Sequence, residues 1–192
     1  MFSGSSVVKH GIVRKIRAII PQTRPCGVDL SLQRVLKWTS PATIDFDYSS
    51  RQPAATSELS FDGEPETISL APGAYLVEFH ETCFIPLNCS GQIFAGAALW
   101  RAGAVLTAGV VEPGYQGVLG ALLDVKNPAG IVVHKNARLG QIVFQRIAEK
   151  RPWDGGTSQH PPDIPGSDGP TAKKRNYGKY RKPKMGETGQ LE

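Results

Sequence analysis

The stretch from residue 67 to residue 147 is a succession of short apolar segments separated by turn signals. The segments read TISL, AYLVEFHETCFIPL, QIFAGAALW, AVLTAGVV, VLGALLDV, IVV and RLGQIVFQRI, and turns such as APG, EPGYQG and KNPAG lie between them. Short strands with frequent glycine and proline turns indicate an all-β sandwich or a barrel-like sheet and argue against a parallel α/β fold.

The N-terminus predicts one short helix. Ser5 or Ser6 can cap it, and Pro21 and Pro25 are expected to end it. The apolar residues that recur at helical spacing are Val8, Ile12, Ile16 and Ile19. After the helix, CGVDLSLQRVLKW alternates in the period of a strand, and residues 40–66 are predicted to form a long surface loop or an irregular hairpin.

The length and composition predict one domain with a tail. A chain of 192 residues with 40% hydrophobic content can bury one core of ordinary size. We expect a β domain over residues 1–150. Residues 151–192 are predicted to form a flexible Pro- and Gly-rich linker and a basic C-terminal arm, because they are too poor in branched apolar residues to support a core.

The charge is concentrated in the tail. Seven Lys or Arg residues lie from Lys173 onward against Glu187 and Glu192, which leaves residues 1–172 balanced at 15 basic and 15 acidic residues. Such a tail suggests a phosphate-binding flap, a nuclear address or a loose nucleic-acid contact. Nucleic-acid binding is the weaker interpretation, since the body shows no aromatic-basic platform.

The cysteines and the N-terminus indicate the compartment. Cys26, Cys83 and Cys89 are an odd set without CxxC spacing, which argues against a disulfide framework or a zinc site. Charged residues interrupt the N-terminal apolar positions, so neither a signal peptide nor a membrane span is expected. We expect a cytoplasmic or nuclear protein that is not secreted and does not contact a membrane.

A turn between two apolar runs carries the first candidate site residues. Glu112-Pro113-Gly114-Tyr115 suits a type II β-turn, with proline and glycine at its two central positions. This stretch belongs to a longer series that reads CGVDLSL, ALWRAG, GVVEPGYQG, ARLGQIVFQRI and, in the tail, YGKYRKPKMGETG. In this order, the series resembles the trimeric dUTPase and dCTP deaminase superfamily from about Cys26 to Ile147, with Gly109–Gly117 and Ala137–Phe144 as its most specific parts.

The resemblance implies a fold and an activity. The fold would be a distorted jelly-roll β-sandwich of the dUTPase type with a short N-terminal helix and a flexible C-terminal tail. Three copies would assemble into a homotrimer with sites built from more than one subunit. The activity would be hydrolysis of dUTP, a deoxynucleoside triphosphate, to dUMP and pyrophosphate with the assistance of Mg²⁺.

The resemblance also assigns roles to residues. Glu112 would be the general base for the attacking water, and Tyr115 would pack against the deoxyribose, with Gly117 closing the same motif. Gln141 would line the site, and Asp29 would act on the metal through water. A structural role stays open for three of these: Asp29 as a turn cap, Tyr115 as core, and Gln141 as a solvent-facing strand residue. Arg138, in the last motif, is expected to be an internal ion-pair partner.

Three departures from the family pattern bear on activity. Gly96-Ala97-Ala98 stands where the family has Arg-Ser-Ser, which holds phosphates. Arg101 survives in that motif, and Lys179 and Arg181 of the tail are predicted to supply further phosphate contacts. Glu112 replaces an aspartate, and Leu122 stands where the deaminase branch needs a glutamate, which argues against dCTP deamination.

Two interpretations follow from these departures. The first is an active dUTPase-like hydrolase. The second is a catalytically inactive homologue that serves as a nucleotide- or protein-binding module, which the loss of Arg-Ser-Ser favours.

Overall fold

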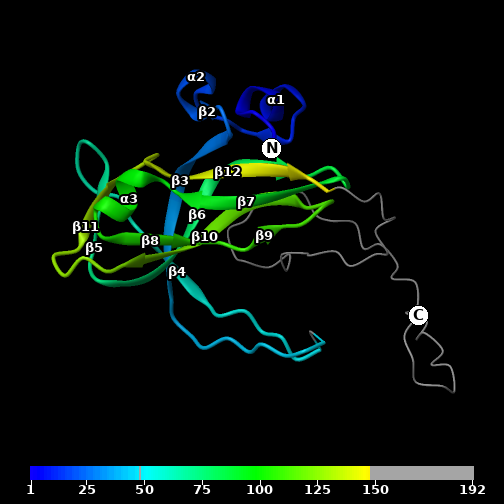
Figure 1. Cartoon of the computed structure of the whole chain (residues 1–192). Coiled ribbons are helices and arrows are strands. Elements are labelled where there is room, and N and C mark those ends of the chain that lie inside the picture. The colour runs from blue at the N-terminus through cyan, green and yellow to red at the C-terminus, as the bar shows by residue number, and fades with distance from the viewer. Residues whose placement is uncertain (48, 148–192) are drawn as a thin grey trace, which may run out of the picture.

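The computed structural model describes residues 1–47 and 49–147, which fold around one curled antiparallel sheet (Figure 1). The helices are α1 (Gly4–Lys9), α2 (Ile19–Gln22) and α3 (Ala97–Arg101). The strands are β1 (Val13–Arg14), β2 (Thr23–Arg24), β3 (Gly27–Trp38), β4 (Thr56–Leu59), β5 (Thr67–Leu70), β6 (Gly73–Phe84), β7 (Cys89–Ala95), β8 (Ala104–Thr107), β9 (Val110–Val111), β10 (Gln116–Val125), β11 (Ile131–His134) and β12 (Arg138–Arg146). The all-β prediction is confirmed.

The main sheet closes over on itself to enclose the core. Its strand order is β8-β10-β6-β3-β12-β7-β9, and a separate pair joins β11 to β5. A Cβ placed on Gly140 of β12 would lie 2.7 Å from Leu106 Cδ2 of β8, so two strands far apart in this order pack face to face. Three neighbouring strands, β6, β3 and β12, each place a fully buried side chain in this core: Phe79, Leu30 and Phe144 respectively. This curled antiparallel sheet confirms the predicted jelly-roll type of fold.

The prediction for the N-terminal helix is wrong in its extent. The helix α1 has Ser3 as its N-cap, whose hydroxyl accepts a hydrogen bond from the Ser6 amide, and it ends at Lys9. Gly11 then adopts a φ of +65°, a left-handed conformation that turns the chain. Ile12 and Val13 continue into the core, where Val13 pairs with Cys83 of β6. Strand pairing therefore overrides the helical spacing of the apolar residues.

A second correction concerns the segment 92–100, which was expected to be a strand. Its second half is the helix α3, capped by Gly96. Alanines favour a helix, and only Leu99 of this helix is buried. The described residues between 40 and 66 form an irregular hairpin, one of the two predicted forms: Thr43 and Gln52 are bridged, and β4 pairs with β3.

The C-terminal predictions fall outside the described residues. These are the linker and basic arm over residues 151–192 and the candidate phosphate contacts Lys179 and Arg181. Within residues 1–47 and 49–147, no helix combines the length and the apolar content that crossing a membrane requires.

Candidate functional site

Asp29 and Gln141 lie side by side on the outer face of the sheet. Gln141 of β12 stands opposite Asp29 of β3 on one side and opposite Phe94 of β7 on the other. Directly opposed residues point to the same face of an antiparallel sheet. Their chain neighbours Leu30 and Ile142 are fully buried in the core, so the row itself faces outward.

The Asp29 carboxylate is held between two guanidinium groups. Its Oδ2 accepts a hydrogen bond from Arg24 Nε at 2.9 Å and another from Arg138 Nη1 at 3.3 Å. Arg138 also donates to the carbonyl of Pro21 at 2.5 Å. The Asp29 side chain is 15% exposed, whereas the two arginine side chains are 45% and 44% exposed. The predicted ion-pair role of Arg138 is confirmed. Arg24, Asp29 and Arg138 form one cluster, in which the Asp29 carboxylate accepts from both arginines.

The Gly96-Ala97-Ala98 stretch lies beside this cluster. The Gly96 amide donates to the Leu139 carbonyl at 2.9 Å, so the start of α3 is fixed against the residue that follows Arg138. Ala97 and Ala98 are exposed and offer no polar side-chain atoms. Arg101, at the end of α3, is exposed, and its guanidinium carbon lies 5.2 Å from the centroid of the Trp100 ring.

The Glu112 turn is anchored by its backbone. The Tyr115 amide donates to the Glu112 carbonyl at 3.1 Å, and Gly114 has a φ of +79°, as a type II turn requires. Two further bonds of 2.9 Å fix the turn to Ile85: the Gly114 amide donates to the Ile85 carbonyl, and the Ile85 amide donates to the Tyr115 carbonyl. The Glu112 side chain is exposed. The turn therefore presents a carboxylate from a rigid backbone.

Within a single chain, Glu112 does not lie near Asp29 and Gln141. Val111 of β9 pairs with Gly91 of β7, which pairs with Phe144 of β12. Glu112 therefore lies near the far end of β12, roughly 13 Å along the strands from Gln141 and about 10 Å across them. Within a single chain, Glu112 and its turn are therefore separate from Asp29 and Gln141.

Tyr115 packs inward rather than standing free at the surface. Its hydroxyl donates to the carbonyl of Val118, and its ring contacts the core. Burial raises the pKa of the Tyr115 hydroxyl well above its ordinary value, with smaller effects from the nearby Cys83 and Glu78. The predicted contact with a deoxyribose would therefore have to use the ring and not the hydroxyl.

Gly117 is required by the position of the Tyr115 hydroxyl. A Cβ at residue 117 would lie 2.9 Å from Tyr115 Oη, and a stiff aromatic ring cannot yield at low cost. We expect Gly117→Ala to lower the free energy of unfolding by about 1 to 3 kcal/mol in urea denaturation. Gly109→Ala is the matched control, because a Cβ there meets nothing within 4 Å. Equal free energies of unfolding for Gly117→Ala and Gly109→Ala would contradict the requirement for glycine at residue 117.

A buried carboxylate that the sequence motifs did not indicate, that of Glu81, lies on the inner side of the sheet and is linked by hydrogen bonds to the segment that carries Asp29. Glu81 of β6 is fully buried and accepts from the Ser31 amide at 2.8 Å, the Ser31 hydroxyl at 2.7 Å and Gln22 Nε2 at 2.6 Å. Gln22 Nε2 also donates to the Asp29 carbonyl at 2.9 Å. The alternation of β6 contained the signal: Tyr75, Val77, Phe79, Glu81 and Cys83 share its inward face.

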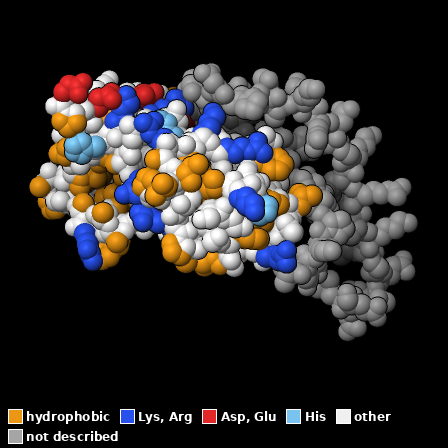
Figure 2. Space-filling view, turned by 90° about the horizontal axis from the view of Figure 1, so that it is seen from above, with side chains coloured by type: hydrophobic (Ala, Val, Ile, Leu, Met, Phe, Trp, Pro, Cys, Tyr) orange, Lys and Arg blue, Asp and Glu red, His pale blue; other side chains and the backbone are white. Residues whose placement is uncertain are grey.

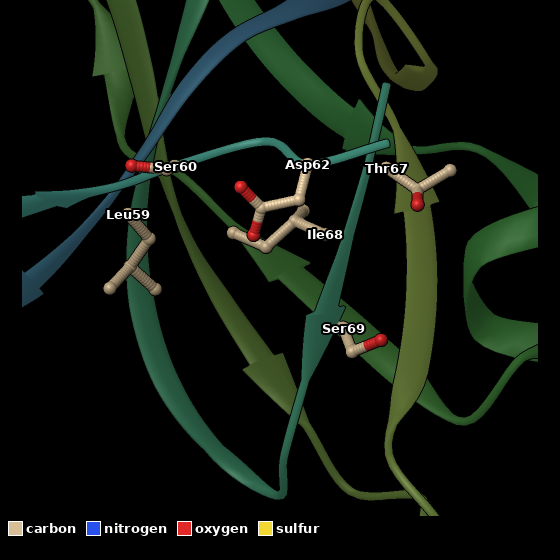
Figure 3. A pocket seen from close by; sticks show the side chains of 6 residues that line it. All are labelled: Leu59, Ser60, Asp62, Thr67, Ile68 and Ser69. Atoms are coloured by element: carbon tan, nitrogen blue, oxygen red, sulfur yellow. The ribbon is translucent and has the colours of Figure 1, made fainter. Parts of the chain in front are cut away.

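A shallow pocket of about 380 Å³ lies elsewhere, between β4 and β5 (Figure 3). It is lined by Leu59, Ser60, Asp62, Thr67, Ile68 and Ser69. None of the predicted site residues is among them, so the motifs do not point to this pocket.

The described residues do not form a cage for a metal ion. Within residues 1–47 and 49–147, no group of three or more His, Cys, Asp or Glu side chains converges closely enough to hold one. Asp29 already carries two charged hydrogen bonds, so its carboxylate fits an indirect contact through water better than direct coordination.

The fold is thus a mostly β domain built on one curled antiparallel sheet. The family model described as dCTP deaminase-like matches residues 5–147. The chain belongs to this dCTP deaminase-like family, within the dCTP deaminase and dUTPase superfamily that the sequence motifs predicted.

Two archaeal relatives illustrate the similarity. The chain is 36% identical over 126 residues to a "Probable deoxyuridine 5'-triphosphate nucleotidohydrolase" of Methanosarcina mazei, covering 66% of this chain and 73% of the relative. It is 35% identical over 123 residues to the "Deoxyuridine 5'-triphosphate nucleotidohydrolase" of Methanocaldococcus jannaschii, covering 64% and 78% of the two chains.

A solved structure shares the fold. The 2'-deoxycytidine 5'-triphosphate deaminase of Agrobacterium tumefaciens aligns with a TM-score of 0.55 at 18% identity, over 76% of this chain and 49% of that one. This chain thus matches about half the length of that deaminase.

Proposed function

We propose that this chain is a dUTPase-like nucleotidohydrolase that converts dUTP to dUMP and pyrophosphate. The similarity to relatives named deoxyuridine 5'-triphosphate nucleotidohydrolases supports the substrate. The observation that carries the proposal is geometric: Asp29, Gln141 and the start of α3 lie together on the outer face of the sheet, while the turn with Glu112 is exposed beyond its edge strand β9. Two such half-sites can be joined when copies of the chain associate.

In this proposal the roles divide between the two groups. Glu112 takes a proton from a water molecule, whose oxygen attacks the α-phosphorus, and the bond from that phosphorus to the bridging oxygen breaks to release pyrophosphate. Tyr115 places its ring against the deoxyribose, and Gly117 keeps the space for that ring. Gln141 and Arg101 line the other half. Lys179 and Arg181 stay predicted phosphate contacts.

Mg²⁺ is the proposed cofactor. It would offset the charge of the triphosphate and so favour attack at the α-phosphorus. Asp29 would hold it through water, because its carboxylate oxygen is shared between Arg24 and Arg138. This agrees with the tendency of Mg²⁺ to keep several waters and to bind mainly through substrate phosphates.

The proposed assembly is a homotrimer. Phe94 and Val110 lie on the outer face near the Asp29 row with 46% and 60% of their surface exposed. Apolar side chains at such positions are suited to burial against another copy. A heterologous contact, repeated around a threefold axis, would bring the Glu112 turn of one copy to the Asp29 row of the next.

Mixing two inactive variants tests whether the site is shared. Glu112→Gln and Asp29→Asn are each expected to lose pyrophosphate release. Mixed trimers refolded from equal amounts should recover about one site in four, because some interfaces then combine an intact Asp29 with an intact Glu112. Trimers of each variant alone, carried through the same refolding, are the control. Failure of mixed trimers to recover activity would place the whole site within one chain.

A non-catalytic homologue is the second candidate, favoured by the exposed Ala97 and Ala98. Pyrophosphate release from dUTP, with dCTP and the other deoxynucleoside triphosphates in parallel, separates the two. Release from dUTP supports the hydrolase. A folded trimer without turnover of any of them supports the binding module.

A further inference from the structure

The N-terminal segment brings an unbalanced positive charge to one face of the molecule. The first 28 residues contain no Asp or Glu, and their basic residues are Lys9, Arg14, Lys15, Arg17 and Arg24. All five are exposed. Figure 2 looks onto the face that carries α1 and α2: Lys and Arg side chains are spread over it, and Asp and Glu gather at one edge. An anionic ligand is therefore attracted to this face.

Two of the arginines on this face are held in place. Arg24 lies in β2, which pairs with β3 next to Asp29, and its Nε donates to that carboxylate. Arg138 is fixed by the same carboxylate and by the Pro21 carbonyl. One carboxylate between two guanidinium groups leaves an excess of one positive charge. Within the described part of the chain, the terminal nitrogens of Arg24 make no hydrogen bond, so this group keeps donors for a further acceptor.

The position of the pair matches the position of the missing phosphate contacts. The Gly96 amide is bonded to Leu139, the residue after Arg138, and Gly96-Ala97-Ala98 replaces Arg-Ser-Ser. A compensating charge is thus present on β12, which the start of α3 contacts, and on β2, which Asp29 links to β12. Gln141 lies beside Asp29 in the same outward-facing row, so its side chain borders the same part of the surface.

We propose that Arg24 and Arg138 bind the phosphates of the nucleotide, in place of the lost Arg-Ser-Ser contacts; the assignment rests on the proposed function. Guanidinium groups suit this task, because they stay charged and present paired N–H donors to phosphate oxygens. Asp29 orients both arginines and is a positioning residue. Arg24 lies outside every motif that the family resemblance supplied.

The test measures binding of tripolyphosphate and of deoxyuridine to the full-length chain by calorimetry, without Mg²⁺. Arg24→Gln and Arg138→Gln are each expected to weaken tripolyphosphate binding by about tenfold or more and to leave deoxyuridine binding unchanged. Arg24→Lys should retain part of the affinity. Lys37→Gln is the matched control, since it removes the same charge from an exposed position on β3, roughly 26 Å along the strand from Asp29 and on the side away from Glu112.

Asp29→Asn separates phosphate binding from a purely structural ion pair. If the arginines bind phosphate, the loss of the competing carboxylate should tighten tripolyphosphate binding severalfold. If the cluster is only structural, Asp29→Asn and Arg24→Gln should both leave that affinity unchanged. The latter result overturns the inference, as does an equal loss in Lys37→Gln, which would indicate general charge attraction.

The inference and the proposed function fail in different ways. Turnover of dUTP that is insensitive to Arg24→Gln and Arg138→Gln contradicts the inference and leaves the hydrolase standing. Tripolyphosphate binding that depends on both arginines, without release of pyrophosphate from dUTP, supports the inference and indicates the binding module.

Discussion

Replacement of Glu112 by glutamine is expected to lower pyrophosphate release from dUTP by at least about 10² to 10⁴-fold, the usual contribution of a positioned general base. The amide keeps the size of the side chain but cannot accept the proton of the attacking water. Since the Glu112 side chain is exposed and the turn is fixed through backbone atoms, the fold and the assembly should not change. The measurement is the initial rate of pyrophosphate formation in Mg²⁺, with the mass of the assembly determined in parallel.

Glu64→Gln is the control for this substitution, because Glu64 is also exposed and lies in the turn before β5. It should leave the rate unchanged. A Glu112→Gln protein as active as the parent would show that another group accepts the proton. Glu112→Asp adds a further comparison, since the family's hydrolases carry aspartate here and the side chains differ by one methylene.

Most of the strands were predictable because their signal is local. Turn chemistry such as Glu112-Pro113-Gly114-Tyr115 depends on a proline and a glycine at fixed positions, and the structure confirms the turn. The extent of the first helix was not predictable from spacing alone. Ile12 and Val13 are buried by pairing with β6, a contact with residues about 70 positions away in the chain.

The site was predictable only in its parts. Motif order predicts Asp29, Gln141 and Glu112 as site residues, but no local pattern places Arg24 beside Asp29, since that contact depends on the pairing of β2 with β3. The separation of Glu112 from Gln141 also depends on the order of β12, β7 and β9 in the sheet. The chemistry of the candidate side chains could be predicted from the sequence. Their separation into one group on the outer face of β3 and β12 and another beyond β9 could not.

Glu81→Ala is expected to have the largest effect on stability, lowering the free energy of unfolding by about 3 to 5 kcal/mol. The substitution removes the acceptor of three hydrogen bonds from a fully buried position and leaves the Ser31 amide and hydroxyl without their partner. It also opens a cavity behind β3. Urea denaturation measures the change. Glu58→Ala is the control, because the Glu58 side chain is 58% exposed and should cost at most about 0.5 kcal/mol.

Glu81→Gln refines the interpretation, because an amide of nearly the same size presents two N–H donors to a site where all three hydrogen bonds are donated to residue 81. Its loss of stability should lie between those of the control and of Glu81→Ala. Since Gln22 joins Glu81 to the Asp29 carbonyl, the same variant is expected to loosen the segment that carries Arg24 and to weaken tripolyphosphate binding. A Glu81→Gln protein as stable as the parent would contradict the role given to the Glu81 carboxylate as the acceptor of these bonds.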